Sequence, residues 1–167
     1  SSGRITETGT GDPVSDFADI EEELNMWYQK ILEGNREKLQ KMIKSENDHI
    51  SALTELYQGL GVKKSHVMES LRLTGLEGKN IENYDLRDSK KFTTQLRKIS
   101  KPTLIVANKI DVPGADKNFV RLSERYNDMI VVPASADSEL TLRRAEQKDL
   151  IKYSPGSELF DILKTNE

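Results

Sequence analysis

The chain has 167 residues and a formal net charge of −3, with 32% charged and 35% hydrophobic residues. This length suits one ordinary domain or two small ones, and the high charged fraction favours long exposed helices over one compact globule. The near-balanced charge argues for neither nucleic acid nor membrane, and the absence of cysteine excludes disulfides and thiolate metal sites. The absence of cysteine makes a cytoplasmic protein the simplest interpretation. No apolar run approaches membrane-spanning length.

The N-terminal half predicts an antiparallel hairpin of two helices. Residues 1–15 are expected to be a tag remnant and linker, because Gly, Thr and Asp dominate them. Apolar residues three and four positions apart predict a helix over 17–33, capped by Ser15 or Asp16, and a second over 36–58. The break between them is Gly34-Asn35. Their apolar seams, which predict a coiled coil, are Phe17, Ile20, Leu24, Trp27 and Ile31 in the first helix, and Leu39, Met42, Ile43, Ile50, Leu53, Leu56, Tyr57 and Leu60 in the second.

Helices and two strands are expected to follow. Ser65 is predicted to cap a short helix that stops near Gly75, and Asp85 to cap another, with Asp88 at its third position. Strands are predicted over 103–107 and 129–132, with a helix over 116–126 between them. This order predicts a βαβ unit with parallel strands. Helices are also expected over 139–148 and 157–163, so the fold class is α/β.

The first predicted strand delivers the tetrapeptide Asn108-Lys109-Ile110-Asp111 at its carboxyl end, where open α/β sheets bind ligands. This motif resembles the base-recognition motif of P-loop GTPases. The resemblance implies that Asp111 accepts from guanine N1–H and the 2-amine, that Lys109 covers the base plane, and that Asn108 fixes the loop and reaches N7. Adenine would leave the carboxylate unpaired. The alternative is a polar loop in which Asn and Asp merely favour the turn.

A second small-residue turn, Ser135-Ala136, follows the second predicted strand at the same sheet edge. In P-loop GTPases a Ser-Ala pair at this distance donates a backbone N–H to guanine O6, and small side chains let the backbone approach the base. Asp111-Val112-Pro113-Gly114 also matches the Asp-x-x-Gly of the magnesium segment. That segment should precede the base motif, whereas here it overlaps it, so we reject this assignment.

Together these motifs resemble those of the YchF-type, Obg-related P-loop GTPases of archaeal character. The resemblance spans residues 12–160. Its most specific part is Pro133-x-Ser135-Ala136-x-x-Glu139-Leu140-Thr141-Leu142-Arg143-Arg144-Ala145; the acidic helix with Glu23 and Trp27, the Gly59-Leu60-Gly61-Val62 helix end and Tyr153-x-Pro155-Gly156 also match. It implies a helical coiled-coil insert over 16–84 and the C-terminal, base-reading part of a GTPase domain over 85–167. It also implies a translation-associated, ribosome-binding protein that hydrolyses GTP.

The phosphate-binding part of such a GTPase is missing. No Gly-x-x-x-x-Gly-Lys-Ser/Thr occurs in the 167 residues, so we expect a fragment of a parent GTPase whose Mg²⁺ ligands and catalytic residues lie outside it. We predict that the fragment hydrolyses no GTP, that its exposed apolar surface allows a homodimer, and that neither His49 nor His66 has a role. One alternative is an ATP-preferring P-loop hydrolase. Another is an interaction module that contacts ribosome or RNA through Lys30, Arg36, Lys38, Lys41 and Lys44, although a solvated helical face is the simpler interpretation.

Overall fold

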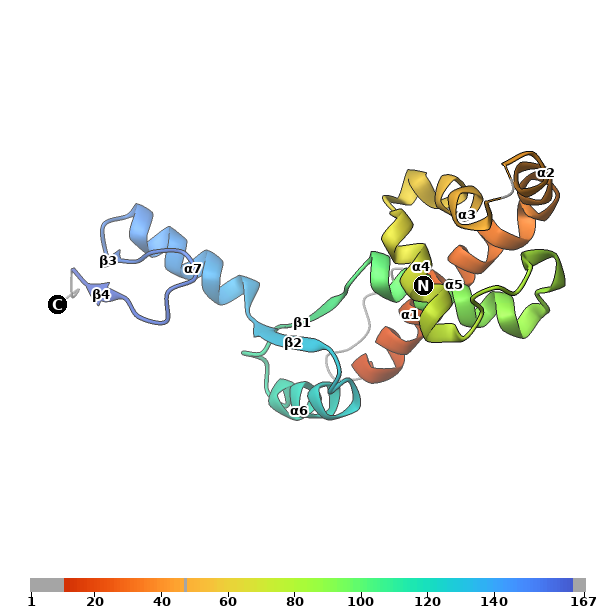
Figure 1. Ribbon diagram of the computed structural model, residues 1–167. Helices are drawn as coiled ribbons and strands as arrows, with labels where there is room; N and C mark the ends of the chain where they lie inside the picture. The colour runs from red at the N-terminus through yellow and green to blue at the C-terminus, as the bar shows by residue number, and fades with distance from the viewer. Residues whose placement is uncertain (1–10, 47, 164–167) are drawn as a thin grey trace. The chain divides into compact units, whose positions relative to one another are not determined.

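The computed structural model describes residues 11–46 and 48–163, which divide into two compact units. The helical unit comprises Ser15–Thr103, and the α/β unit takes in the chain from Leu104 together with residues up to Val14. Figure 1 labels the elements. The helical unit is built from α1 (Pro13–Gly34), α2 (Arg36–Glu46), α3 (His49–Tyr57), the 3-10 turn η1 (Gln58–Leu60), α4 (Lys64–Thr74), the 3-10 turn η2 (Ile81–Asn83) and α5 (Leu86–Ser100).

The core of the helical unit gathers side chains from all five helices. Tyr28 of α1 stacks on Tyr57 of α3, with ring centroids 5.5 Å apart. The Tyr57 hydroxyl donates to the carbonyl of Tyr28 at 2.7 Å, and burial raises the pKa of that hydroxyl. Phe92 of α5 is completely buried and meets Tyr84 edge to face. Aromatic contacts that link distant parts of the chain therefore fix how the helices pack.

The predicted helix over 36–58 is wrong, because the structure divides it into α2 and α3. Asp48 breaks the run: its carboxylate accepts from the backbone N–H groups of Ile50 at 2.9 Å and Ser51 at 3.1 Å, which makes it the N-cap of α3. The Ser51 hydroxyl also donates to this carboxylate and is the main reason that the pKa of Asp48 lies far below its usual range. Asp offers the backbone a cap in competition with a continuous helix.

The predicted seam of α1 is wrong at three of its five positions, although Ile31 does pack against the core. Ile20, Leu24 and Trp27 are 53%, 37% and 49% exposed, whereas Tyr28 and Leu32 are buried. The face of α1 that carries Tyr28 and Leu32 is buried in place of the predicted seam, and the second helix is divided into α2 and α3. For these two reasons, the described residues do not form the predicted coiled-coil hairpin.

The ends of the next helices agree with the sequence in part. Asp85 and Asp88 form the expected capping box of α5, and Gly75 ends α4 in the left-handed conformation, with φ 67°. The predicted cap at Ser65 is wrong: the N-cap residue is Lys63, whose N–H donates to Nδ1 of His66. Since α5 packs against α4, the helical unit includes α5 and extends to Thr103. The assignment of 16–84 and 85–167 to evolutionary domains stays a prediction.

The α/β unit contains β1 (Leu104–Asn108), α6 (Ala115–Arg125), β2 (Ile130–Ala134), α7 (Ala136–Gln147), β3 (Ile151–Lys152) and β4 (Asp161–Ile162). The predicted parallel pairing is confirmed, with Leu104 opposite Ile130 and Asn108 opposite Ala134. The predicted helix over 157–163 is wrong, because β4 pairs antiparallel with β3 there. The Ser157 hydroxyl donates to the carbonyl of Leu159 and accepts from the N–H of the same residue. These local hydrogen bonds compete with those that a helix beginning at Ser157 would need.

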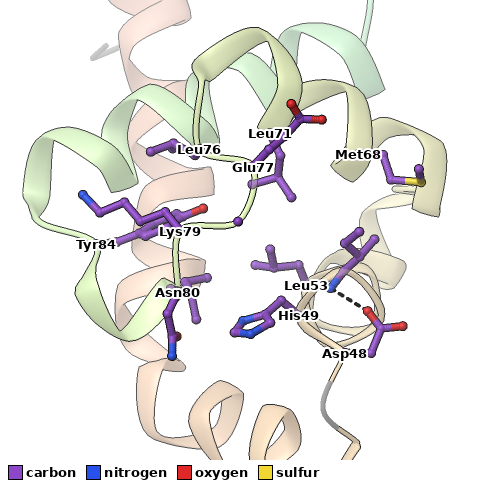
Figure 2. A pocket seen from close by; sticks show the side chains of 13 residues that line it. Asp48, His49, Leu53, Met68, Leu71, Leu76, Glu77, Lys79, Asn80 and Tyr84 are labelled. Atoms are coloured by element: carbon purple, nitrogen blue, oxygen red, sulfur yellow. Dashed lines mark hydrogen bonds between the residues drawn. The ribbon is translucent and has the colours of Figure 1, made fainter.

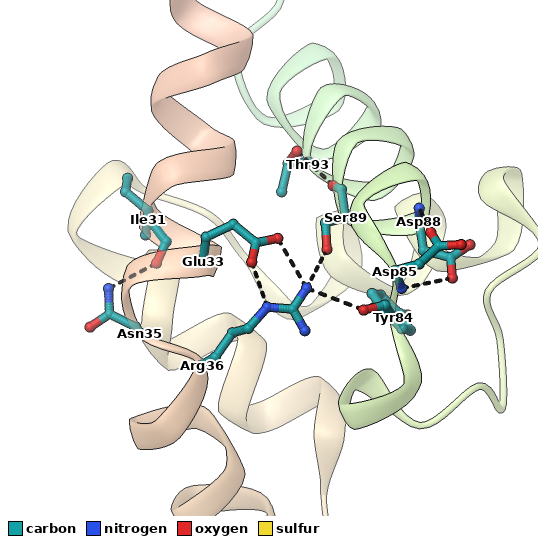
Figure 3. Close-up of polar contacts among 9 residues, drawn as sticks. All are labelled: Ile31, Glu33, Asn35, Arg36, Tyr84, Asp85, Asp88, Ser89 and Thr93. Atoms are coloured by element: carbon teal, nitrogen blue, oxygen red, sulfur yellow. Dashed lines mark hydrogen bonds and ion pairs between the residues drawn. The ribbon is translucent and has the colours of Figure 1, made fainter.

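A polar network joins the α1–α2 junction to the start of α5 (Figure 3). Arg36 donates from Nε to Glu33 at 2.5 Å and from Nη2 to Glu33 at 3.0 Å. The same Nη2 donates to the Tyr84 carbonyl at 3.2 Å and to the Ser89 hydroxyl at 2.8 Å. Arg36 is thus a structural residue of the helical unit, which weakens the expectation that it belongs to a free cationic surface.

The Glu33–Arg36 pair predicts a pH-dependent stability. The hydrogen bond from Arg36 lowers the pKa of Glu33 in the folded state. Its stabilisation is therefore complete above the unfolded-state pKa of Glu33 and is lost as the pH falls through the lowered folded value. We expect Glu33→Gln to lower the free energy of unfolding by about 0.5–1 kcal/mol at pH 7, because both side chains are about one-third exposed. Urea unfolding should show this gap narrowing as the pH falls through the lowered pKa of Glu33, whereas Glu55→Gln, at an exposed helical position, should change little at any pH. A gap that stays constant as the pH is lowered would contradict the linkage.

Candidate functional site

The candidate site lies where β1 and β2 end. Leu104, Ile105 and Val106 favour an extended strand, and Ile105 is its buried residue. Beyond Asn108, Lys109 adopts the left-handed conformation, with φ 66°. The N–H of Val112 then donates to the Lys109 carbonyl at 3.0 Å and closes a turn. The turn leaves the side chains of both Lys109 and Asp111 exposed.

Two hydrogen bonds join the loop after β1 to the loop after β2. The Asn108 side chain accepts from the N–H of Ala136 at 3.1 Å. The N–H of Ile110 donates to the carbonyl of Ala134 at 3.1 Å. The in-register parallel pairing of Asn108 with Ala134 brings the loops into reach. The structure therefore brings the five predicted site residues together where β1 and β2 end and α7 begins: Asn108, Lys109, Asp111, Ser135 and Ala136.

Ser135 connects the second loop to α7 and lies beside Asp111. As N-cap of α7, it accepts from the N–H of Ser138 at 3.1 Å, and its hydroxyl donates to the Ser138 hydroxyl at 2.8 Å. The Ser135 hydroxyl is also the main cause that lowers the pKa of Asp111, followed by the aspartate's own N–H and the charge of Lys109. An exposed carboxylate held in its ionised form can accept two hydrogen bonds from a planar ligand edge.

One predicted contact looks different in the structure. The sequence suggested that the backbone at Ser135 and Ala136 donates to a carbonyl of the ligand. The N–H of Ala136 instead donates to the side chain of Asn108. Asn108 therefore holds the backbone at Ala136 through the N–H that was expected to face the ligand. The roles of the five site residues stay a prediction.

Side-chain contacts of Glu139 hold α7, and the sequence analysis did not predict them. Glu139 of α7 accepts from the Tyr153 hydroxyl at 2.6 Å and from Arg143 Nε at 2.7 Å. These two donors lower the pKa of Glu139, and the bond to Glu139 raises the pKa of Tyr153. The Tyr153 hydroxyl also accepts from the N–H of Gly156. Only the four-residue spacing of Glu139 and Arg143 was visible in the sequence.

Within residues 11–46 and 48–163, no group of three His, Cys, Asp or Glu side chains is placed to hold a metal ion. Over the same residues, no helix combines the length and the apolar character that crossing a bilayer requires.

Comparison with known proteins adds to this geometry. Residues 106–167 match the family model "Obg-like GTPase YGR210-like, G4 motif-containing domain". The chain is 36% identical over 157 residues to an uncharacterized GTP-binding protein of Methanocaldococcus jannaschii, covering 93% of this chain and 39% of that protein. It is 31% identical to an uncharacterized GTP-binding protein of Schizosaccharomyces pombe, covering 91% and 37%.

A solved structure agrees with the sequence relatives. The crystal structure of a GTP binding protein from Pyrococcus horikoshii OT3 superposes with a TM-score of 0.75 at 34% identity, over 86% of this chain and 42% of that one. The chain thus spans about two fifths of the length of these relatives. The sequence analysis predicted the YchF type in particular. These matches do not distinguish that type from other Obg-like proteins. The chain is therefore similar to Obg-like GTP-binding proteins over most of its length, and residues 106–167 match the G4 motif-containing domain of that family.

Proposed function

We propose that this chain supplies the guanine-reading loops and a helical domain to a longer, YchF-type GTPase that binds GTP with Mg²⁺ and hydrolyses it to GDP and phosphate. The observation that carries the proposal is the hydrogen bond between Asn108 and the N–H of Ala136, which joins the two motif loops. Asp111 lies in the loop that follows Asn108, at the sheet edge where α/β folds bind ligands, and the Ser135 hydroxyl is the main cause that lowers its pKa.

Guanine is the base that suits this edge. Its N1–H and 2-amine are adjacent donors, and Asp111 offers two acceptor oxygens on an exposed side chain. Adenine has an acceptor at N1, which would face the carboxylate and leave it without a donor. Lys109 is exposed in the same turn, so its aliphatic stem can cover the base while the ammonium stays hydrated.

Nucleotide selectivity tests the proposal directly. In the full-length protein with Mg²⁺, GDP should displace a fluorescent guanine nucleotide at a concentration at least about 100-fold lower than ADP. Equal displacement by the two nucleotides, or preference for ADP, would favour the alternative of an ATP-preferring hydrolase and overturn guanine recognition.

The isolated 167-residue chain should not hydrolyse GTP. Phosphate loops hold the β- and γ-phosphates through backbone amides, a lysine and Mg²⁺, and the loop motif does not occur in these residues. We expect phosphate release by the purified chain to equal the buffer blank, while the full-length protein releases phosphate from GTP. GTP turnover by the isolated chain above the blank would contradict the proposal that the phosphate-binding and catalytic residues lie outside these 167 residues.

We further propose that the full-length protein is cytoplasmic and contacts the ribosome or its RNA. Lys30, Lys38, Lys41 and Lys44 of α1 and α2 are exposed, which supports a cationic contact surface. Ribosome co-sedimentation that weakens with added salt, and weakens further on reversal of these charges, would agree with it. In the isolated chain, the exposed apolar side chains of Leu104, Val106, Ile130 and Val132 support a homodimer, which light scattering would detect.

A further inference from the structure

The helical unit contains a cavity of about 370 Å³ that the proposed nucleotide site does not use (Figure 2). It lies among α3, α4 and the segment from Leu76 to Tyr84. Its wall is mainly apolar and includes five buried side chains: Leu53, Leu71, Leu76, Ile81 and Tyr84. The exposed side chain of Met68 also lines it. A cavity of this size and lining lies within the range of small-molecule sites.

One polar atom at this cavity has no partner. Nδ1 of His49 is buried and lacks a hydrogen bond within the part of the chain that the structure describes. Figure 2 shows the imidazole directed from the start of α3 toward the loop that carries Lys79 and Asn80. Buried polar atoms of native proteins are nearly always satisfied, so an orphaned nitrogen beside a cavity indicates a missing partner.

Three charged side chains line the cavity; Glu77 is exposed, and the other two are already engaged. The carboxylate of Asp48 accepts from Ile50, Ser51 and Lys64, and the ammonium of Lys79 donates to Asp88. An ionic ligand would have to compete with these pairs. A largely apolar ligand with one hydrogen-bonding group, which could satisfy His49, matches the remaining chemistry better.

We propose that this cavity binds a small heteroaromatic molecule whose ring nitrogen hydrogen-bonds to Nδ1 of His49. The aliphatic side chains of Leu53, Leu71 and Ile81 and the ring of Tyr84 offer an apolar wall to a flat ring. An imidazole nitrogen can pair with either a ring N–H or a ring nitrogen, depending on its tautomer. The site lies wholly in the helical unit, so it stands or falls independently of guanine recognition.

The test compares benzimidazole, which carries both a ring N–H and a ring nitrogen, with indene, a hydrocarbon of nearly the same shape. In methyl NMR titrations of the 167-residue chain, both probes should shift the signals of Leu53, Leu71 and Ile81. Benzimidazole should bind about five- to tenfold more tightly, which is the net effect of one hydrogen bond. His49→Phe should abolish that difference by weakening benzimidazole alone.

Two methionine variants separate this cavity from other surfaces. Met68 lines the cavity and is 51% exposed, so Met68→Trp should fill the space without disturbing the core and block both probes. Met26 is 45% exposed on α1 and does not line the cavity, so Met26→Trp should bind both probes like the parent chain. The proposal is overturned if millimolar benzimidazole leaves these methyl signals unmoved, if Met68→Trp still binds, or if the preference for benzimidazole survives in His49→Phe.

Discussion

Replacing Asp111 with asparagine should shift the base preference of the full-length protein from guanine toward xanthine. The carboxylate can accept from the N1–H and 2-amine of guanine, whereas an amide offers one acceptor and a donor that opposes the 2-amine. Xanthine carries a carbonyl at that position, which the amide N–H can satisfy. Because a binding site built on hydrogen bonds strongly rejects a ligand that leaves its groups unpaired, we expect GDP affinity to fall by at least about 100-fold and XDP affinity to rise.

Competition binding with GDP, XDP and ADP would measure this shift. Asp116→Asn provides the matched control, because Asp116 is an exposed aspartate in the first turn of α6 just beyond the loop. That variant should keep the parent preference. The assignment of Asp111 to the Watson–Crick edge fails if Asp111→Asn binds GDP as tightly as the parent, or if GDP and ADP lose affinity equally with no gain for XDP.

Replacing Arg97 with alanine should destabilise the helical unit more than removal of any exposed ion pair. Only 2% of Arg97 is exposed, and its guanidinium donates to Glu21 at 2.7 Å and to Asn25 at 2.7 Å. These contacts tie α5 to α1. Removing one partner of a buried pair leaves the other charge without compensation, so we expect a loss of about 3–5 kcal/mol in the free energy of unfolding.

Urea denaturation followed by circular dichroism would measure the loss. Arg121→Ala is the matched control, because Arg121 and its partner Asp12 are 53% and 48% exposed at a distance of 3.0 Å. That pair should contribute less than about 1 kcal/mol. Similar losses for the two variants would show that burial does not set the strength of the Arg97 contact.

The fold was predictable where the signal was local. The parallel βαβ unit followed from two short apolar runs and the helix between them, and the capping box of Asp85 and Asp88 from its three-residue spacing. The buried face of α1 was not predictable in this way. Apolar residues occur on more than one side of that helix, and the stacking of Tyr28 on Tyr57, a residue of α3, decides which side is buried.

The candidate site shows the same division. Its five residues could be named because they match two short GTPase-like motifs, each near the carboxyl end of a predicted strand, and parallel strands end at one edge of a sheet. The bond from the N–H of Ala136 to Asn108 could not be predicted, because it depends on how two loops 28 residues apart approach each other. The unpaired nitrogen of His49 could not be predicted for a related reason: an isolated histidine has no sequence pattern, and the burial of its Nδ1 depends on how the surrounding helices pack.

The bridge between Asn108 and Ala136 bears on the kinetics of ligand capture. Loops that are already joined in the free protein lose little conformational entropy when a ligand arrives, so less of the contact free energy is spent on ordering them. Encounter with the base then need not wait for a loop to close, and association can proceed at the rate typical of a preformed pocket. Asn108 would in this way govern how fast a nucleotide is captured, through a contact that exists before the nucleotide binds.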